Sequence, residues 1–140
     1  MLLNASYNHP ERREKINEEI GKAFTLMEPI KKKGVGSHKL FITSTSIEIH
    51  HLLILDKYIN TCNIEIRPDG IIVTFRSLLE TYALVIPYYK LKLYKSKAEE
   101  YSIYRDHYFI KVKADTKNTH IFMKKLLDFK ANHWTSSSHP

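Results

Sequence analysis

The stretch Asn63-Ile-Glu-Ile-Arg67, Pro68-Asp69-Gly70, Ile71-Ile-Val-Thr-Phe-Arg76 decides what fold the sequence predicts. In both of its flanking segments alternate residues are apolar, the period of two that places one face of a strand against a core. Pro-Asp-Gly between them is a strong turn signal, because proline presets φ and glycine accepts positive φ. The stretch therefore predicts a β-hairpin over residues 62–77.

Further short strands are expected on both sides of this hairpin. They are predicted at 39–43, 47–50, 81–86, 88–94, 101–105 and 107–113. Residues 51–59 stay open between a buried strand and a short helix, with a slight preference for strand, because periodicity does not decide so short an apolar run. The segments predict an antiparallel sheet of six to seven strands over residues 38–113, curled into a partial barrel.

An amphipathic helix is expected before the sheet, over residues 9–28. Its apolar stripe is formed by Ile16, Ile20, Ala23, Phe24 and Met27, which recur at helical spacing. The stripe is expected to pack on the sheet, and a dimer contact is the alternative. A second amphipathic helix is predicted over 116–132, where it caps the sheet, and residues 135–140 are expected to be disordered.

Length and composition indicate one α+β domain over residues 1–140. The chain has 140 residues, of which 43% are hydrophobic, enough to build a core. Cys62 is the only cysteine, so no internal disulfide is available. No apolar run is long enough for a signal peptide or a transmembrane helix, and a cytoplasmic location is expected. The net charge of +7 favours anionic partners.

Two features together resemble a known superfamily. These are the bend Val85-Ile-Pro-Tyr-Tyr-Lys-Leu91 and the closing helix at 117–131. With them, residues 38–132 resemble the pleckstrin-homology-like and GRAM-like superfamily, including its bacterial members, in which the last helix caps a partial barrel. The best-known inositide binders of that family use basic residues in the first hairpin loop. The corresponding loop, Thr43 to Ser46, has none, a departure that argues against that mode of binding.

No catalytic pattern is present, and the chain is not expected to be an enzyme. The histidines lack metal-binding spacing, and His50 and His51 would point to opposite faces of a strand. No metal and no cofactor are expected. Arg105-Asp106-His107 is interpreted as a turn, and Cys62 as a small buried side chain.

The candidate site is a set of tyrosine and basic residues interleaved on strands. Tyr88, Lys90, Lys92 and Tyr94 are expected on one strand face, with Tyr101, Tyr104, Arg105, Tyr108, Lys111 and Lys113 nearby. The basic loop residues Lys31, Lys32 and Lys33 are a second candidate. The predicted function is a binding module for an anionic lipid or an acidic protein. The alternatives are single-stranded nucleic-acid binding, a small α+β enzyme with a cone-shaped pocket, and a homodimer interface built from the tyrosines.

Overall fold

The computed structural model describes residues 1–6, 10–24, 35–55, 60–96 and 99–137. These residues form three helices and one eight-stranded antiparallel sheet, so the α+β class with an antiparallel sheet is confirmed. The expectation was six to seven strands, and the sheet has eight. It does not close into a barrel, because its outermost strands, β1 and β6, do not pair with each other. None of the helices in the described ranges is long and apolar enough to cross a membrane.

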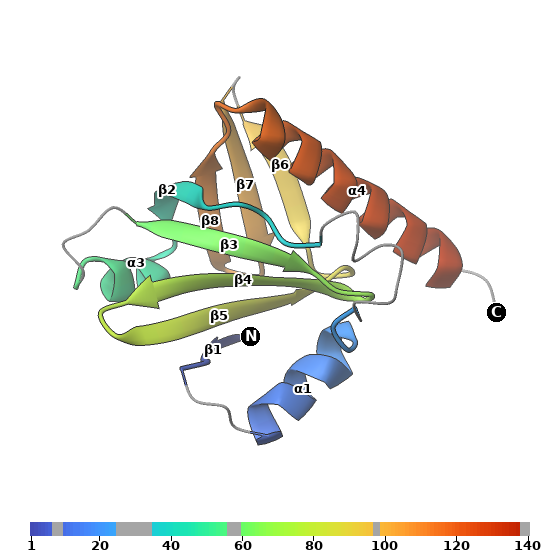
Figure 1. Ribbon diagram of the computed structural model, residues 1–140, viewed down its shortest axis with the longest axis horizontal. Helices are drawn as coiled ribbons and strands as arrows, with labels where there is room; N and C mark the ends of the chain where they lie inside the picture. Colours follow the sequence, from blue (N-terminus) through green and yellow to red (C-terminus); the bar gives the residue numbers. More distant parts are fainter. Residues whose placement is uncertain (7–9, 25–34, 56–59, 97–98, 138–140) are drawn as a thin grey trace.

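The elements follow one another along the chain in the order shown by the colours of Figure 1. They are β1 (Leu2–Asn4), α1 (Pro10–Ile20), β2 (Leu40–Thr45), α3 (Ile47–Leu53), β3 (Thr61–Ile66), β4 (Gly70–Ser77), β5 (Glu80–Pro87), β6 (Lys92–Ser96), β7 (Glu100–Arg105), β8 (Tyr108–Lys113) and α4 (Lys117–Ser137).

The strands lie in the order β1-β5-β4-β3-β2-β8-β7-β6. In Figure 1 the strands β3, β4 and β5 run across the view, and β6, β7 and β8 cross them at a steep angle. The strand between the two groups is β2, which pairs with β3 at Leu40 and Phe41 and with β8 from Ile42 to Thr45. The register with β8 shifts between Ile42 and Ser44, and such an irregularity bends a strand.

The hairpin predicted at 62–77 is confirmed as β3 and β4, with Ile66 opposite Ile71. Its glycine is required for packing. A Cβ at Gly70 would lie 2.4 Å from the carbonyl oxygen of Ile86 and 2.5 Å from Ile20. Only glycine therefore lets the start of β4 lie this close to β5 and to the end of α1.

Two apolar clusters lie on opposite faces of the sheet. The larger one fills the space between the inner face and α4, whose Phe122, Met123 and Leu126 are buried in it. The smaller one lies on the outer face, where Ile20 of α1 packs on β4 and β5. The strands β4 and β5 are consequently covered on both faces around Ile72 and Val85.

The first helix is shorter than the range 9–28 expected for it. It ends at Ile20, and Gly21 follows with φ of 83°, a left-handed conformation that commonly ends helices. The expected stripe is therefore split. Ile16 and Ile20 face the sheet from α1, whereas Phe24 lies beyond the helix and packs edge-on against Phe129. Residues 25–28 lie outside the described part of the chain.

Two expected strands are not strands. Residues 47–50 belong to the helix α3, which follows Ser46 and buries Ile49 and Leu53 four residues apart on one face. The preference for strand at 51–53 was therefore wrong, and residues 56–59 lie outside the described ranges. Residues 88–90 form a turn after β5, so the predicted strand 88–94 begins only at Lys92.

Both ends of the chain differ from expectation. The strand β1 was not predicted, and it extends the sheet by pairing Leu2 with Leu84. The last helix begins at Lys117 and continues to Ser137, past its expected end at 132 and into the tail expected to be disordered. Residues 138–140 of that tail are not among those described.

Candidate functional site

The outer face of β6, β7 and β8 carries tyrosine, phenylalanine and lysine side chains, with Ser102 and Glu100 of β7 among them. Residues that alternate with these, such as Leu93, Ile103 and Ile110, face the core. Cross-strand pairing then sets the members of the outer face side by side, because Lys92 is opposite Tyr104 and Tyr104 is opposite Phe109. We call this set the Tyr–Lys face; it consists of Lys92, Tyr94, Tyr104, Phe109, Lys111 and Lys113.

Three aromatic rings form a row across the three strands of this face. The ring centroids of Tyr94 and Tyr104 are 5.8 Å apart, and those of Tyr104 and Phe109 are 5.6 Å apart. The ammonium group of Lys111 lies 5.6 Å from the centroid of Phe109, within the range of a cation–π contact. Tyr94, at the open end of the row, is 56% exposed. The row is therefore fixed by mutual packing and accessible at β6.

The charge of the face is mainly positive. Lys92 is exposed and has no ion pair with any residue in the described ranges. Lys113 pairs with Asp115 at 3.4 Å, just beyond the strand. The carboxylate of Glu100 accepts hydrogen bonds from Thr43 at 2.8 Å and from Ser96 at 3.2 Å, so its oxygens are engaged by neighbouring hydroxyls.

Of the four residues expected on one strand face, the structure places only Lys92 and Tyr94 on the Tyr–Lys face. Tyr88 is buried, its hydroxyl donates a hydrogen bond to the carbonyl oxygen of Arg67 at 2.9 Å, and burial raises the pKa of its phenol. Lys90 lies in the turn after β5 and pairs with Asp106 at 3.7 Å. Tyr88 is thus a packing residue in this arrangement.

The wider set of expected neighbours also divides between the two faces. Tyr104, Lys111 and Lys113 are on the Tyr–Lys face, whereas Tyr101 and Tyr108 point toward the core. Arg105 is buried, where it contacts the carboxylate of Glu19 and the carbonyl oxygen of Val85. Phe109 was missed, although its alternation with Ile110 along β8 was a usable signal. The basic loop residues Lys31, Lys32 and Lys33 lie outside the described residues.

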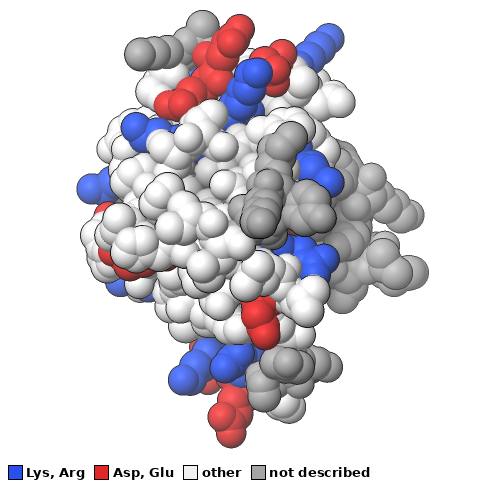
Figure 2. All heavy atoms as spheres, turned by 90° about the vertical axis from the view of Figure 1, so that its left-hand side faces the viewer, with Lys and Arg blue, Asp and Glu red and all other residues white. Residues whose placement is uncertain are grey.

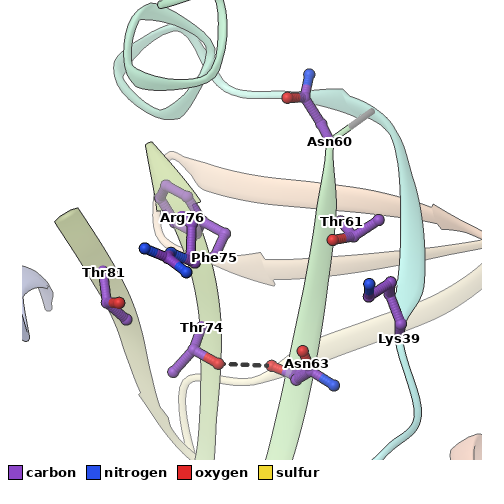
Figure 3. A pocket seen from close by; sticks show the side chains of 8 residues that line it. All are labelled: Lys39, Asn60, Thr61, Asn63, Thr74, Phe75, Arg76 and Thr81. Atoms are coloured by element: carbon purple, nitrogen blue, oxygen red, sulfur yellow. Dashed lines mark hydrogen bonds between the residues drawn. The ribbon is translucent and has the colours of Figure 1, made fainter. Parts of the chain in front are cut away.

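A second polar feature lies on the outer face of the other half of the sheet. It is a cavity of about 360 Å³ over β3, β4 and β5, close to the start of β2. Figure 3 shows its lining, which consists of Lys39, Asn60, Thr61, Asn63, Thr74, Phe75, Arg76 and Thr81. Among these described lining residues the ionisable groups are two cations, an arrangement suited to holding an anion rather than to exchanging protons near neutral pH.

The remaining reactive groups do not form a site in the described part of the chain. Burial raises the pKa of the Cys62 thiol from 9.0 to about 12, so the thiolate needed for nucleophilic attack is not formed at neutral pH. No three His, Cys, Asp or Glu side chains converge there in a way that could hold a metal ion. The turn interpreted at Arg105-Asp106-His107 is confirmed as the connection between β7 and β8.

Comparison with protein-family models, with curated proteins and with solved structures finds no match.

Proposed function

We propose that the chain is a non-enzymatic binding module of the pleckstrin-homology-like type that holds an anionic partner, an anionic lipid surface or an acidic protein, on the Tyr–Lys face. The observation that carries the proposal is the position of Lys92 and Lys111 beside one aromatic row on the outer sheet face, with Lys113 further along β8. The family assignment is supported by the succession of antiparallel strands from β2 to β8, followed by α4 packed on their inner face.

The chemistry of the face suits such partners. Lysines attract carboxylates or lipid phosphates at long range, and this attraction weakens as salt screens it. Tyrosine rings provide contact area at little cost in side-chain entropy, and the row already holds Tyr104 between two neighbours. The partner therefore meets a surface whose central rings are preorganised and whose charges lie around them.

The test reverses charge on the Tyr–Lys face and compares it with the opposite face of the same strand. The variant Lys92→Glu/Lys111→Glu is expected to bind phosphatidylserine vesicles, or a polyglutamate peptide, at least about tenfold more weakly than the unmodified chain at low salt. Whichever probe binds identifies the partner class. The measurement is vesicle co-sedimentation for the lipid and calorimetric titration for the peptide.

Lys95→Glu is the matched control, because Lys95 lies on β6 with the opposite orientation to Lys92 and Tyr94. It changes net charge by the same amount per residue but leaves the Tyr–Lys face intact. Equal losses in Lys92→Glu and Lys95→Glu would mean that only overall charge matters, and unchanged binding in the double variant would refute the proposal.

Single-stranded nucleic acid is the second candidate, favoured by the spacing of the rings. Bases stack on successive aromatic side chains in many single-strand binders, and stacking is worth about 1–3 kcal/mol per base. Tyr94→Ala is expected to weaken binding of a short single-stranded RNA about tenfold or more, with a steep dependence on salt in the unmodified chain. If the unmodified chain does not bind single-stranded RNA at low salt, nucleic-acid binding is refuted. The proposal of an anionic lipid or acidic protein is not affected by that result.

A further inference from the structure

The outer face of β3, β4 and β5 changes character along the strands. Near the start of β4 it is apolar, because Ile72 and Val85 lie opposite each other and are covered by α1. Two and four residues further along β4 the outward side chains are Thr74 and Arg76, which are not covered. The cavity of about 360 Å³ begins where the cover given by α1 ends.

Two rows of cross-strand neighbours build this cavity. In one row Asn63 lies opposite Thr74. Lys39 joins that row from the residue before β2, one step from the pair of Leu40 and Cys62. In the second row Arg76 lies opposite Thr81, with Thr61 on the other side of β4. The lining is therefore set by strand register and not by a single loop.

The two cations lie on either side of β3. Figure 3 shows the guanidinium of Arg76 directed toward Thr81 and the ammonium of Lys39 directed toward β3. Strands two apart are separated by roughly 10 Å, so one ligand contacts both cations when Arg76 turns from Thr81 toward β3. Neither cation has an ion pair with a residue in the described ranges, and the described lining contains no carboxylate.

We propose that this cavity binds a phosphate monoester group. An arginine provides a planar fork of donors and a lysine provides a point charge, and together they match a dianion with several acceptor oxygens. The hydroxyl groups of Thr61 and Thr81 and the amide of Asn60 offer further donors around the same space. The Thr74 hydroxyl donates to the carbonyl oxygen of Asn63 at 3.5 Å, and the Asn63 amide donates to the carbonyl oxygen of Ser37 at 3.3 Å. A volume of about 360 Å³ is in the range of small-molecule sites, so the phosphate enters with a small group attached.

The neighbouring hairpin tip distinguishes two sources for such a phosphate. Arg76 is followed by the turn between β4 and β5, where Leu78 and Leu79 are 57% and 87% exposed. Leu78 has φ of 57°, in the left-handed region that leucine rarely adopts. Figure 2 faces this end of the molecule, where uncharged atoms cover most of the middle of the face and charged side chains gather toward its top and bottom. A phosphate monoester carried by a membrane lipid would place hydrocarbon beside these leucines, and a soluble one would not.

The first experiment titrates the unmodified chain with glycerol 3-phosphate and follows backbone amide signals by NMR. Saturable shifts are expected at Arg76, Thr74 and Lys39. Arg76→Gln and Lys39→Gln are each expected to weaken binding at least tenfold, and Thr74→Val, which keeps the shape of the side chain, is expected to weaken it about threefold. Lys95→Gln, a lysine exposed on β6, is the matched control and should leave the affinity unchanged.

The second experiment compares vesicles of phosphatidylcholine with and without phosphatidic acid, whose headgroup is a phosphate monoester. If the source is a lipid, the chain binds only the phosphatidic acid vesicles, and Leu79→Ser weakens that binding while glycerol 3-phosphate binds as before. If the source is soluble, glycerol 3-phosphate binds, and Leu79→Ser and Arg76→Gln leave any binding of phosphatidic acid vesicles through the Tyr–Lys face unchanged. Failure of glycerol 3-phosphate to bind, or glycerol 3-phosphate binding that Arg76→Gln does not change, overturns the proposal. The site shares no residue with the Tyr–Lys face, so each proposal fails or stands without the other.

Discussion

The two halves of the sheet differ in how many of their faces are covered. The strands β4 and β5 have α1 on the outer face and the main core on the inner face along their unbroken apolar runs, Ile71-Ile72-Val73 and Ala83-Leu84-Val85-Ile86. The strands β6 and β8 alternate apolar and polar residues, because only their inner face is buried. A strand buried on both faces thus has an unbroken apolar run, and a strand buried on one face alternates apolar and polar residues.

This difference separates stability from binding within one sheet. In the doubly covered half, outward side chains such as Ile72 are packing residues that few substitutions would preserve. In the β6–β8 half, outward side chains such as Lys92 and Tyr94 are exposed and contribute little to the core. Surface chemistry can therefore vary there without loss of the fold.

The largest effect is expected at the tightest contact of the doubly covered half. Gly70→Ala places a methyl group against the backbone at Ile86 and Pro87, at 2.4 and 2.8 Å, and neither can move without disturbing β5. We expect the free energy of unfolding to fall by about 4 kcal/mol, above the usual cost of overpacking. Urea unfolding followed by circular dichroism measures it.

Gly36→Ala is the matched control for this substitution. A Cβ at Gly36 meets nothing within 4 Å, so the same change should shift the free energy of unfolding by less than about 0.5 kcal/mol. Similar losses in both variants would show that the contact at Gly70 does not limit the packing of α1 against the sheet.

A smaller effect is expected when outward side chains of the two halves are truncated in the same way. Ile72→Ala removes a side chain that is 6% exposed and packs under α1, and it should cost about 3 kcal/mol. Tyr94→Ala removes a larger side chain that is 56% exposed, and it should cost less than about 1 kcal/mol. Urea unfolding measures both losses. A larger loss for Tyr94→Ala than for Ile72→Ala would contradict the difference in burial between the two halves.

A graded effect is expected for stability at alkaline pH. Burial raises the pKa of the Cys62 thiol from 9.0 to about 12, and burial also raises the pKa of Tyr88, with a further contribution from the charge of Asp69. In the unfolded chain the thiol loses its proton above about pH 9 and the phenol above about pH 10, while the native chain keeps both protons. The contribution of these groups to stability is therefore fully present below about pH 9 and declines as the pH rises.

Each such group is expected to contribute a decline of about 1.4 kcal/mol per pH unit above the pKa of the unfolded group. Urea midpoints measured at pH 8, 9, 10 and 11 would give the slope. Cys62→Ala should flatten it, whatever its effect on stability at pH 7. An unaltered slope in Cys62→Ala would contradict the burial of a neutral thiol at this position.

The parts of the fold that could be predicted have local signals. The β3–β4 hairpin was predicted from Pro68-Asp69-Gly70, which specifies a turn without help from the rest of the chain. The helix α3 was missed because its β-branched Ile47 and Ile49 favour strands, although the spacing of Ile49 and Leu53 was a helical signal. The strand β1 has no local signal, since its partner in β5 lies more than seventy residues away.

The candidate site was predicted only in part, for the same reason. Lys92 and Tyr94 follow from the alternation within β6. The turn before β6 could not be foreseen, because it depends on hydrogen bonds from the amides of Lys90 and Leu91 to the carbonyl oxygen of Pro87, at 3.0 and 3.1 Å. The cavity at Lys39 and Arg76 depends on register across three strands, which alternation in any one strand does not reveal.

The division of β2 between its two partners has a consequence for synthesis on the ribosome. Leu40 and Phe41 pair with β3, which is made soon afterwards, whereas Ile42 to Thr45 pair with β8, which begins only at Tyr108. In the interval the nascent chain carries a strand with an unpaired edge, a surface that readily pairs with other chains. A chain stopped before Tyr108 retains this edge permanently. The last strand made thus protects the first long strand from association.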